Sequence, residues 1–219
     1  MAVVIDGSTG VSLVQDGVVT AADLASTLDL STKTLTLPAE NQSSMQVISS
    51  SDTFTSGASA IDIDLPTDSS YRYFKLVLTG VYGSVGFDMY SRVRLDGNTG
   101  FESGASDYDY SAHEGNGTGG SGYTAGAGAS VMRLCWYGQG DANNEAVDWE
   151  ISIFNSNNTT GHFRLQTTYG GSINTGISVV GQSTGQYNGS TGLVDGLRFY
   201  PSSGTFSYRN YTLYGVKAS

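Results

Sequence analysis

The segment that most constrains the fold is Leu193–Ser219, because two strand-like runs lie close together in it. Leu193–Tyr200 and Thr205–Val216 are rich in aromatic and branched residues, which favour a pleated, half-buried surface. Pro201–Gly204 separates them and predicts a hairpin loop, since proline fixes φ and glycine accepts a positive φ. The bulky residues change phase at Arg209-Asn210, which predicts a bulge or a corner between sheets. Strands that end a chain in this way need earlier strands as pairing partners.

Further strands are expected along the chain before this segment. Apolar residues alternate with polar ones, and turn dipeptides separate the runs. The expected strands are Ala60–Leu65, Tyr71–Val81, Phe87–Leu95, Val131–Tyr137, Ala146–Asn155, His162–Tyr169 and the short Ile177–Val180. Phe101–Ser130 is expected to be irregular, because glycine dominates its second half. The fold class predicted is all-β, an antiparallel β-sandwich of jelly-roll-like type.

Composition supports this class and excludes others. The chain has 219 residues, of which only 14% are charged and 30 are glycine. Its net charge of −10 argues against nucleic-acid binding, which needs basic residues to neutralise phosphates, and against docking on an anionic membrane. No apolar run is long enough to cross a bilayer, so no membrane insertion is expected. The first residues lack the pattern of a secretory signal peptide, which predicts synthesis in the cytoplasm of the cell that makes the protein.

Three regions are expected. Residues 1–38 are predicted to be an attachment or oligomerisation segment, because their apolar residues are too few to form a core alone. The candidates for attachment contacts are Val11, Leu13, Val14, Leu24 and Leu28. An N-terminal strand folded back on the main domain is the alternative, and it stays open. Residues 39–51 are polar and serine-rich, typical of a linker, and residues 52–219 are expected to form the sandwich knob.

Two short motifs match catalytic patterns by chance. Gly117–Gly122 fits G-x-G-x-x-G, but no helix is expected after it to present a phosphate site. Gly181–Gly185 fits G-x-S-x-G, yet both histidines precede Ser183 and no helix follows. The single cysteine, Cys135, lies in an apolar run and is expected to be a small buried side chain. No catalytic residue and no cofactor are predicted.

Acidic side chains occur in pairs that a strand would place on one face. These are Asp62 with Asp64 and Asp107 with Asp109, and Glu114 follows the second pair. Such groups would suit a calcium ion, but in so acidic a chain a solvated strand face is the preferred interpretation. No metal site is predicted, and an enzyme that cleaves glycans ranks last because no carboxylate pair stands out for general acid and base roles.

The residues chosen as candidates for binding are three tyrosines of the expected loop, Tyr108, Tyr110 and Tyr123. Tyrosine offers a rigid amphipathic surface that stacks on sugar rings, and loops rich in Tyr, Ser, Gly and Asn are typical of binding surfaces. The alternative, that these tyrosines cover contacts between subunits, stays open.

Several segments resemble bacteriophage fibre-like proteins. The opening D-G-S-T-G-V-S-L-V-Q-D-G-V-V-T-A-A-D-L-A-S (Asp6–Ser26) resembles their N-terminal segments, and G-L-R-F-Y-P-S-S-G-T-F-S-Y-R-N-Y-T-L-Y-G-V-K (Gly196–Lys217) resembles the end of tail-fibre and virion appendage domains. Similar central pieces are Phe74–Leu78, Tyr90–Leu95, Gly104–Tyr108 and Tyr110.

The resemblance implies a homotrimeric virion structural protein that attaches to other virion proteins by its N-terminus and presents a β-sandwich tip. The function expected is a short tail fibre for adhesion to the host surface, with a host glycan as receptor. It would be made in the host cytoplasm and found in the virion. A capsid head fibre or decoration protein, or a free carbohydrate-binding module, is the alternative.

Overall fold

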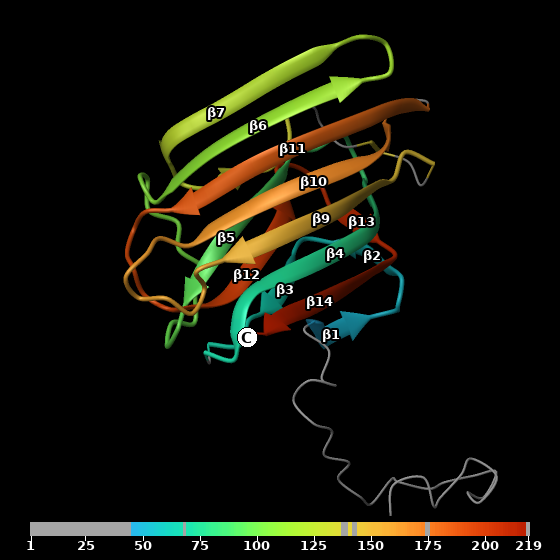
Figure 1. The fold of residues 1–219 in the computed structure, drawn as a ribbon. Coiled ribbons are helices and arrows are strands. Elements are labelled where there is room, and N and C mark those ends of the chain that lie inside the picture. The colour runs from blue at the N-terminus through green and yellow to red at the C-terminus, as the bar shows by residue number, and fades with distance from the viewer. Residues whose placement is uncertain (1–44, 68, 137–139, 142–143, 174–175, 218–219) are drawn as a thin grey trace, which may run out of the picture. The chain divides into compact units, whose positions relative to one another are not determined.

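The protein is an antiparallel β-sandwich (Figure 1). The computed structural model describes residues 45–67, 69–136, 140–141, 144–173 and 176–217. Fourteen strands lie in these residues, and the sandwich predicted from the sequence is confirmed. No helix in this part of the chain has the length and hydropathy to span a membrane.

The larger sheet has ten strands, eight of which follow the order β1-β14-β4-β9-β10-β11-β6-β7, while β13 pairs with both β2 and β4. Its strands are β1 (Met45–Ser51), β2 (Thr55–Ala58), β4 (Tyr71–Gly83), β6 (Tyr108–Asn116), β7 (Ser121–Ala129), β9 (Val147–Phe154), β10 (Arg164–Ile173), β11 (Ile177–Tyr187), β13 (Phe206–Tyr208) and β14 (Asn210–Lys217). The smaller sheet has the order β3-β12-β5-β8. Its strands are β3 (Ile61–Asp64), β12 (Val194–Pro201), β5 (Met89–Leu95) and β8 (Met132–Arg133).

Alternation along the strands separates the core from the outer faces. In β9 the buried residues are Val147, Trp149, Ile151 and Ile153, and the residues between them point outward. The same pattern gives β4 its buried Phe74, Leu76 and Leu78. Trp149 stacks on Tyr169 of the neighbouring strand with 4.2 Å between ring centroids. Because both inner faces are apolar, the two sheets bury a shared core, as in other sandwiches.

The closing segment does not form the hairpin that the sequence predicts. β12 lies in the smaller sheet, with β3 and β5 on its two sides, whereas β13 and β14 belong to the larger sheet. The loop after Pro201 therefore carries the chain from one sheet to the other. A turn signal indicates that the chain changes direction, but it does not say which strand becomes the neighbour, and both edges of β12 are already occupied.

The break expected at Arg209-Asn210 is present. Arg209 separates β13 from β14, and its backbone N–H donates to the carbonyl oxygen of Thr79 at 2.9 Å. The partner strand β4 has its own irregularity there, where Gly80 has φ of 62° and the register with β9 shifts. These paired irregularities form the bulge that lets β4 contact β14 along one part and β13 along the next.

The region expected to be irregular contains a hairpin instead. β6 and β7 pair through a turn at residues 117–120, where the Asn116 side-chain oxygen accepts hydrogen bonds from the backbone of Thr118 and Gly120. Two glycines of β7, Gly122 and Gly126, make room for aromatic rings. A Cβ on Gly122 would lie 2.0 Å from the Trp136 ring, and one on Gly126 would lie 2.5 Å from Tyr110. The sequence did not predict β7, because glycine is depleted in strands and a glycine-rich segment is typical of a loop.

Strand β11 is longer than the sequence predicts, again because glycines weaken the strand signal. It extends from Ile177 to Tyr187, well beyond the predicted end at Val180. Two of its core-facing positions are Gly181 and Gly185, which pack under larger side chains, and a Cβ on Gly181 would lie 2.2 Å from the Tyr169 ring. In the run Val131–Tyr137, by contrast, the described residues 131–136 contribute only the two-residue strand β8. Residues 45–51, within the segment expected to be a linker, form β1 on β14.

Candidate functional site: a polar groove on the larger sheet

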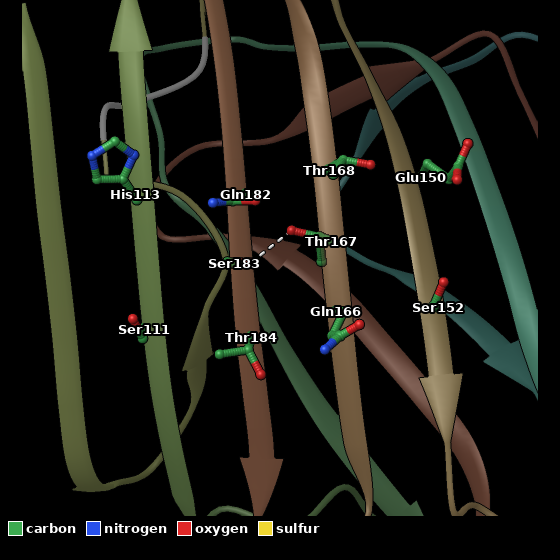
Figure 2. A pocket seen from close by; sticks show the side chains of 10 residues that line it. All are labelled: Ser111, His113, Glu150, Ser152, Gln166, Thr167, Thr168, Gln182, Ser183 and Thr184. Carbon is green, nitrogen blue, oxygen red and sulfur yellow. Dashed lines mark hydrogen bonds between the residues drawn. The ribbon is translucent and has the colours of Figure 1, made fainter.

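The strongest candidate site is a hollow on the outer face of the larger sheet, over β6, β11, β10 and β9 (Figure 2). Its volume is about 450 Å³. The lining side chains are Ser111, His113, Glu150, Ser152, Gln166, Thr167, Thr168, Gln182, Ser183 and Thr184. Nearly all of them are hydroxyl or amide groups. We call this hollow, with its extension described below, the outer groove.

Strand register arranges eight of these side chains in two rows that cross the four strands, as Figure 2 shows. One row is His113, Gln182, Thr168 and Glu150, and the other is Ser111, Thr184, Gln166 and Ser152. Neighbouring strands lie about 4.8 Å apart, so each row is about 14 Å long. The alternation of side chains along the strands points all eight away from the core, and the strand pairing holds them at regular spacing.

The floor of the groove is stiffened by a buried hydrogen bond. Thr167 and Ser183 lie on the core side of β10 and β11, and their hydroxyl oxygens are 2.6 Å apart. Ser183 is the serine of the G-x-S-x-G match. It lies within a strand and is buried, so it is not placed on the strand-to-helix turn that a nucleophile elbow requires.

The groove continues toward the ends of the same strands. A second hollow of about 260 Å³ shares Ser111 and Thr184 with the first and adds Asp109, Tyr110, Arg164, Gly185 and Gln186, so it includes one of the tyrosines chosen from the sequence. Arg164 precedes Gln166 by two residues, so both lie on the outer face of β10. The outer groove therefore offers neutral polar groups along most of its length and one cation toward this end.

The central block of the groove is Gln166, Thr168, Gln182 and Thr184. All four residues are exposed, and their side chains hydrogen-bond to no residue that the structure describes. Amides and hydroxyls both donate and accept, so the block is suited to a ligand that carries many hydroxyl groups. Glu150 is the one carboxylate among the ten lining residues, and it pairs with Lys75 at 2.7 Å. The extension of the groove adds a second carboxylate, Asp109, whose oxygens accept hydrogen bonds from Gly128 N–H and from the Asn188 amide.

The three tyrosines chosen from the sequence do not gather at one surface. Tyr108 is fully buried, and its hydroxyl donates to the carbonyl oxygen of Glu102 and accepts from Val93 N–H. Burial raises its pKa. Tyr108 is therefore a core residue, which corrects the expectation of a loop surface. Tyr110 is half-buried against Gly126 of β7, whereas Tyr123 is 61% exposed and pairs across strands with His113 beside the groove.

The acidic pairs have structural partners. Asp62 pairs with Arg198 and Asp64 with Arg94 on the outer face of the smaller sheet. Asp107 accepts from Gly104 N–H, and Asp109 accepts from Gly128 N–H and from the Asn188 amide. Glu114 is buried and accepts a hydrogen bond from the Tyr169 hydroxyl. No group of three metal-binding side chains occurs in the part of the chain that the structure describes.

Cys135 is buried, as the sequence predicts. Burial raises the pKa of its thiol to about 12, and the Met89 N–H donates to its sulfur at 3.2 Å. At neutral pH such a thiol is almost entirely protonated, so it lacks the thiolate that a nucleophilic cysteine needs.

The residues expected to attach the protein to a virion lie outside the described residues. These are Val11, Leu13, Val14, Leu24 and Leu28, and the placement of residues 1–38 stays a prediction.

Sequence reasoning missed the central block of the groove. Its signal was present as polar residues at every second position, in R-L-Q-T-T of β10 and G-Q-S-T-G-Q of β11. On a strand this spacing places them on one face. That two such strands are neighbours was not visible in the sequence.

Comparison with protein-family models, with curated proteins and with solved structures found no match to this chain.

Proposed function

We propose that this protein is a bacteriophage virion appendage that binds a host-surface glycan in the outer groove. In this proposal the chain is a homotrimer, residues 1–38 attach it to other virion proteins, and the sandwich is its adhesive tip. The observation that supports the binding role is the central block, whose amide and hydroxyl groups form no hydrogen bond with the residues that the structure describes. The virion role is supported by the sequence resemblance at both ends and in the middle of the chain.

The proposed activity is binding rather than cleavage. Both carboxylates that line the outer groove have partners, since Glu150 pairs with Lys75 and Asp109 accepts hydrogen bonds from Gly128 N–H and the Asn188 amide. The strand backbones are already ordered, so binding has to immobilise only the side chains, at a cost of about 0.5–1.5 kcal/mol for each flexible one. Multiple copies in a trimer would raise the apparent affinity without further contacts.

The binding role is tested with the full chain on an array of bacterial surface polysaccharides. We expect saturable binding by the wild type, and about five- to 150-fold weaker binding by the double variant Gln166→Ala/Gln182→Ala, because two hydrogen bonds at about 0.5–1.5 kcal/mol each contribute about 1–3 kcal/mol. The control is Gln46→Ala, an exposed glutamine on β1. A wild type that binds no polysaccharide, or a double variant that binds as the wild type does, would contradict the proposal.

The virion role is tested by immunogold labelling of intact particles with an antibody to the sandwich. Gold at the tail is the result expected for a short tail fibre. Gold over the capsid would support the alternative of a head fibre or decoration protein. Particles without gold would support a free carbohydrate-binding module, whose binding site would again be the outer groove. Deletion of residues 1–38 is expected to abolish incorporation and leave the sandwich folded.

A further inference from the structure

Arg164 gives the outer groove a chemical asymmetry. It lies on the outer face of β10, where its cross-strand neighbours are Phe154 on β9 and Gln186 on β11. It lines the second hollow together with Thr184, which also lines the first. Thr168 follows Arg164 by four positions on β10, so their backbones are about 13 Å apart. Arg164 is therefore about 13 Å along the groove from the row that contains Thr168.

The guanidinium of Arg164 is not engaged by the rest of the fold. It forms no ion pair or hydrogen bond with any residue that the structure describes. Three other arginines hold aspartates: Arg94 at 2.7 and 2.8 Å, Arg133 at 2.9 Å and Arg198 at 2.6 Å. Arg72 and Arg209 also form no such bond with described residues, but neither of them lines the groove. In a chain with a net charge of −10, an exposed arginine without a partner in a polar groove is available to an external anion.

Asp109 is the acidic group in the same hollow, and its oxygens are occupied. One accepts from Gly128 N–H at 2.8 Å, and the other accepts from the Asn188 amide at 2.7 Å. Gln186, which lies between Asp109 and Arg164 in the sheet, donates its amide to Asn188. Asp109 and Arg164 are two strands apart, about 10 Å between backbones, so the carboxylate is held on its own side of the hollow.

We propose that the outer groove recognises an acidic glycan, whose carboxylate binds Arg164 while its neutral hydroxyl groups bind the central block. This inference rests on the proposed glycan-binding function and names the ligand class. A guanidinium forms two parallel hydrogen bonds with a carboxylate, so Arg164 is matched to the planar acid group of a uronic or sialic acid. The Phe154 ring, next to it on β9, offers an apolar wall for a sugar ring.

The test uses an array on which each uronic- or sialic-acid oligosaccharide stands beside its carboxyl-reduced, neutral counterpart. The wild-type full chain is expected to bind the acidic member of a pair at least tenfold more tightly than the neutral one. The variant Arg164→Gln is expected to bind both members equally, at the affinity that the wild type has for the neutral one. Arg72→Gln, which removes an exposed arginine at the start of β4, is the matched control and is expected to keep the preference.

The outcomes distinguish the preference for an acidic glycan from the proposed glycan-binding function on which it rests. Binding of neutral and acidic members with equal affinity by the wild type would overturn the role of Arg164 and leave glycan binding intact. A preference that survives Arg164→Gln would overturn it too. Absence of binding to every member would overturn both proposals. Weaker binding of the acidic member at high salt, with binding of the neutral member unchanged, would support the ion pair.

Discussion

At the scale of residues, Tyr108 shows how one side chain can be misassigned from its sequence context. Its neighbours in the sequence are glycine, serine and aspartate, which are typical of a binding loop. In the structure it lies at the start of β6, where its ring contacts Tyr187 with 5.3 Å between centroids. Its hydroxyl group bonds two backbone groups, so its role is structural.

Tyr108→Phe should therefore lower the free energy of unfolding and leave glycan binding unchanged. Removal of the hydroxyl leaves Val93 N–H and the Glu102 carbonyl without this partner, which costs about 1–3 kcal/mol. Urea denaturation measures the change. Tyr123→Phe, at an exposed position, is the control and should change stability by less than about 0.5 kcal/mol. Equal stability of the two variants would contradict the assigned role of Tyr108.

At the scale of elements, the glycines of β7 are packing positions. Gly122 lies under Trp136, and an added methyl group there would overlap the ring. Gly115, on the outer face of the adjacent strand, has no neighbour closer than 4.0 Å to such a group. Gly122→Ala is expected to destabilise the protein by about 1–3 kcal/mol through overpacking, whereas Gly115→Ala should be nearly neutral. Thermal unfolding of the two variants, with Trp fluorescence as the readout, checks the difference, and similar melting temperatures would contradict it.

Elements with large alternating side chains could be predicted from the sequence. β3, β4, β5 and β9 were expected close to their observed bounds because their apolar residues repeat with period two. The sequence did not predict the hairpin of β6 and β7 or the second half of β11. Small residues in these strands accommodate rings from distant segments, such as Trp136 and Tyr169. The groove was missed for a related reason. Gln166 and Gln182 become one site only through the pairing of β10 with β11, and pairing is a long-range property.

At the scale of the whole molecule, the two outer faces of the sandwich differ in chemistry. The smaller sheet carries arginines and aspartates that neutralise one another, as in the pairs of Arg198 with Asp62 and Arg94 with Asp64. The outer groove of the larger sheet carries neutral polar groups that form no hydrogen bond with described residues, and Arg164 lies beside them. The same face also carries the ion pair of Lys75 with Glu150. In our proposal the larger sheet is the one that recognises the ligand.

The central claim is that the outer groove is the recognition surface. The most direct measurement is NMR mapping of the full chain titrated with the polysaccharide fragment that binds most tightly on the array. We expect the largest shifts in the side-chain amides of Gln166 and Gln182 and in the backbone of β10 and β11. Shifts confined to the turn at residues 117–120 or to the smaller sheet, with the two glutamine amides unmoved, would contradict the account.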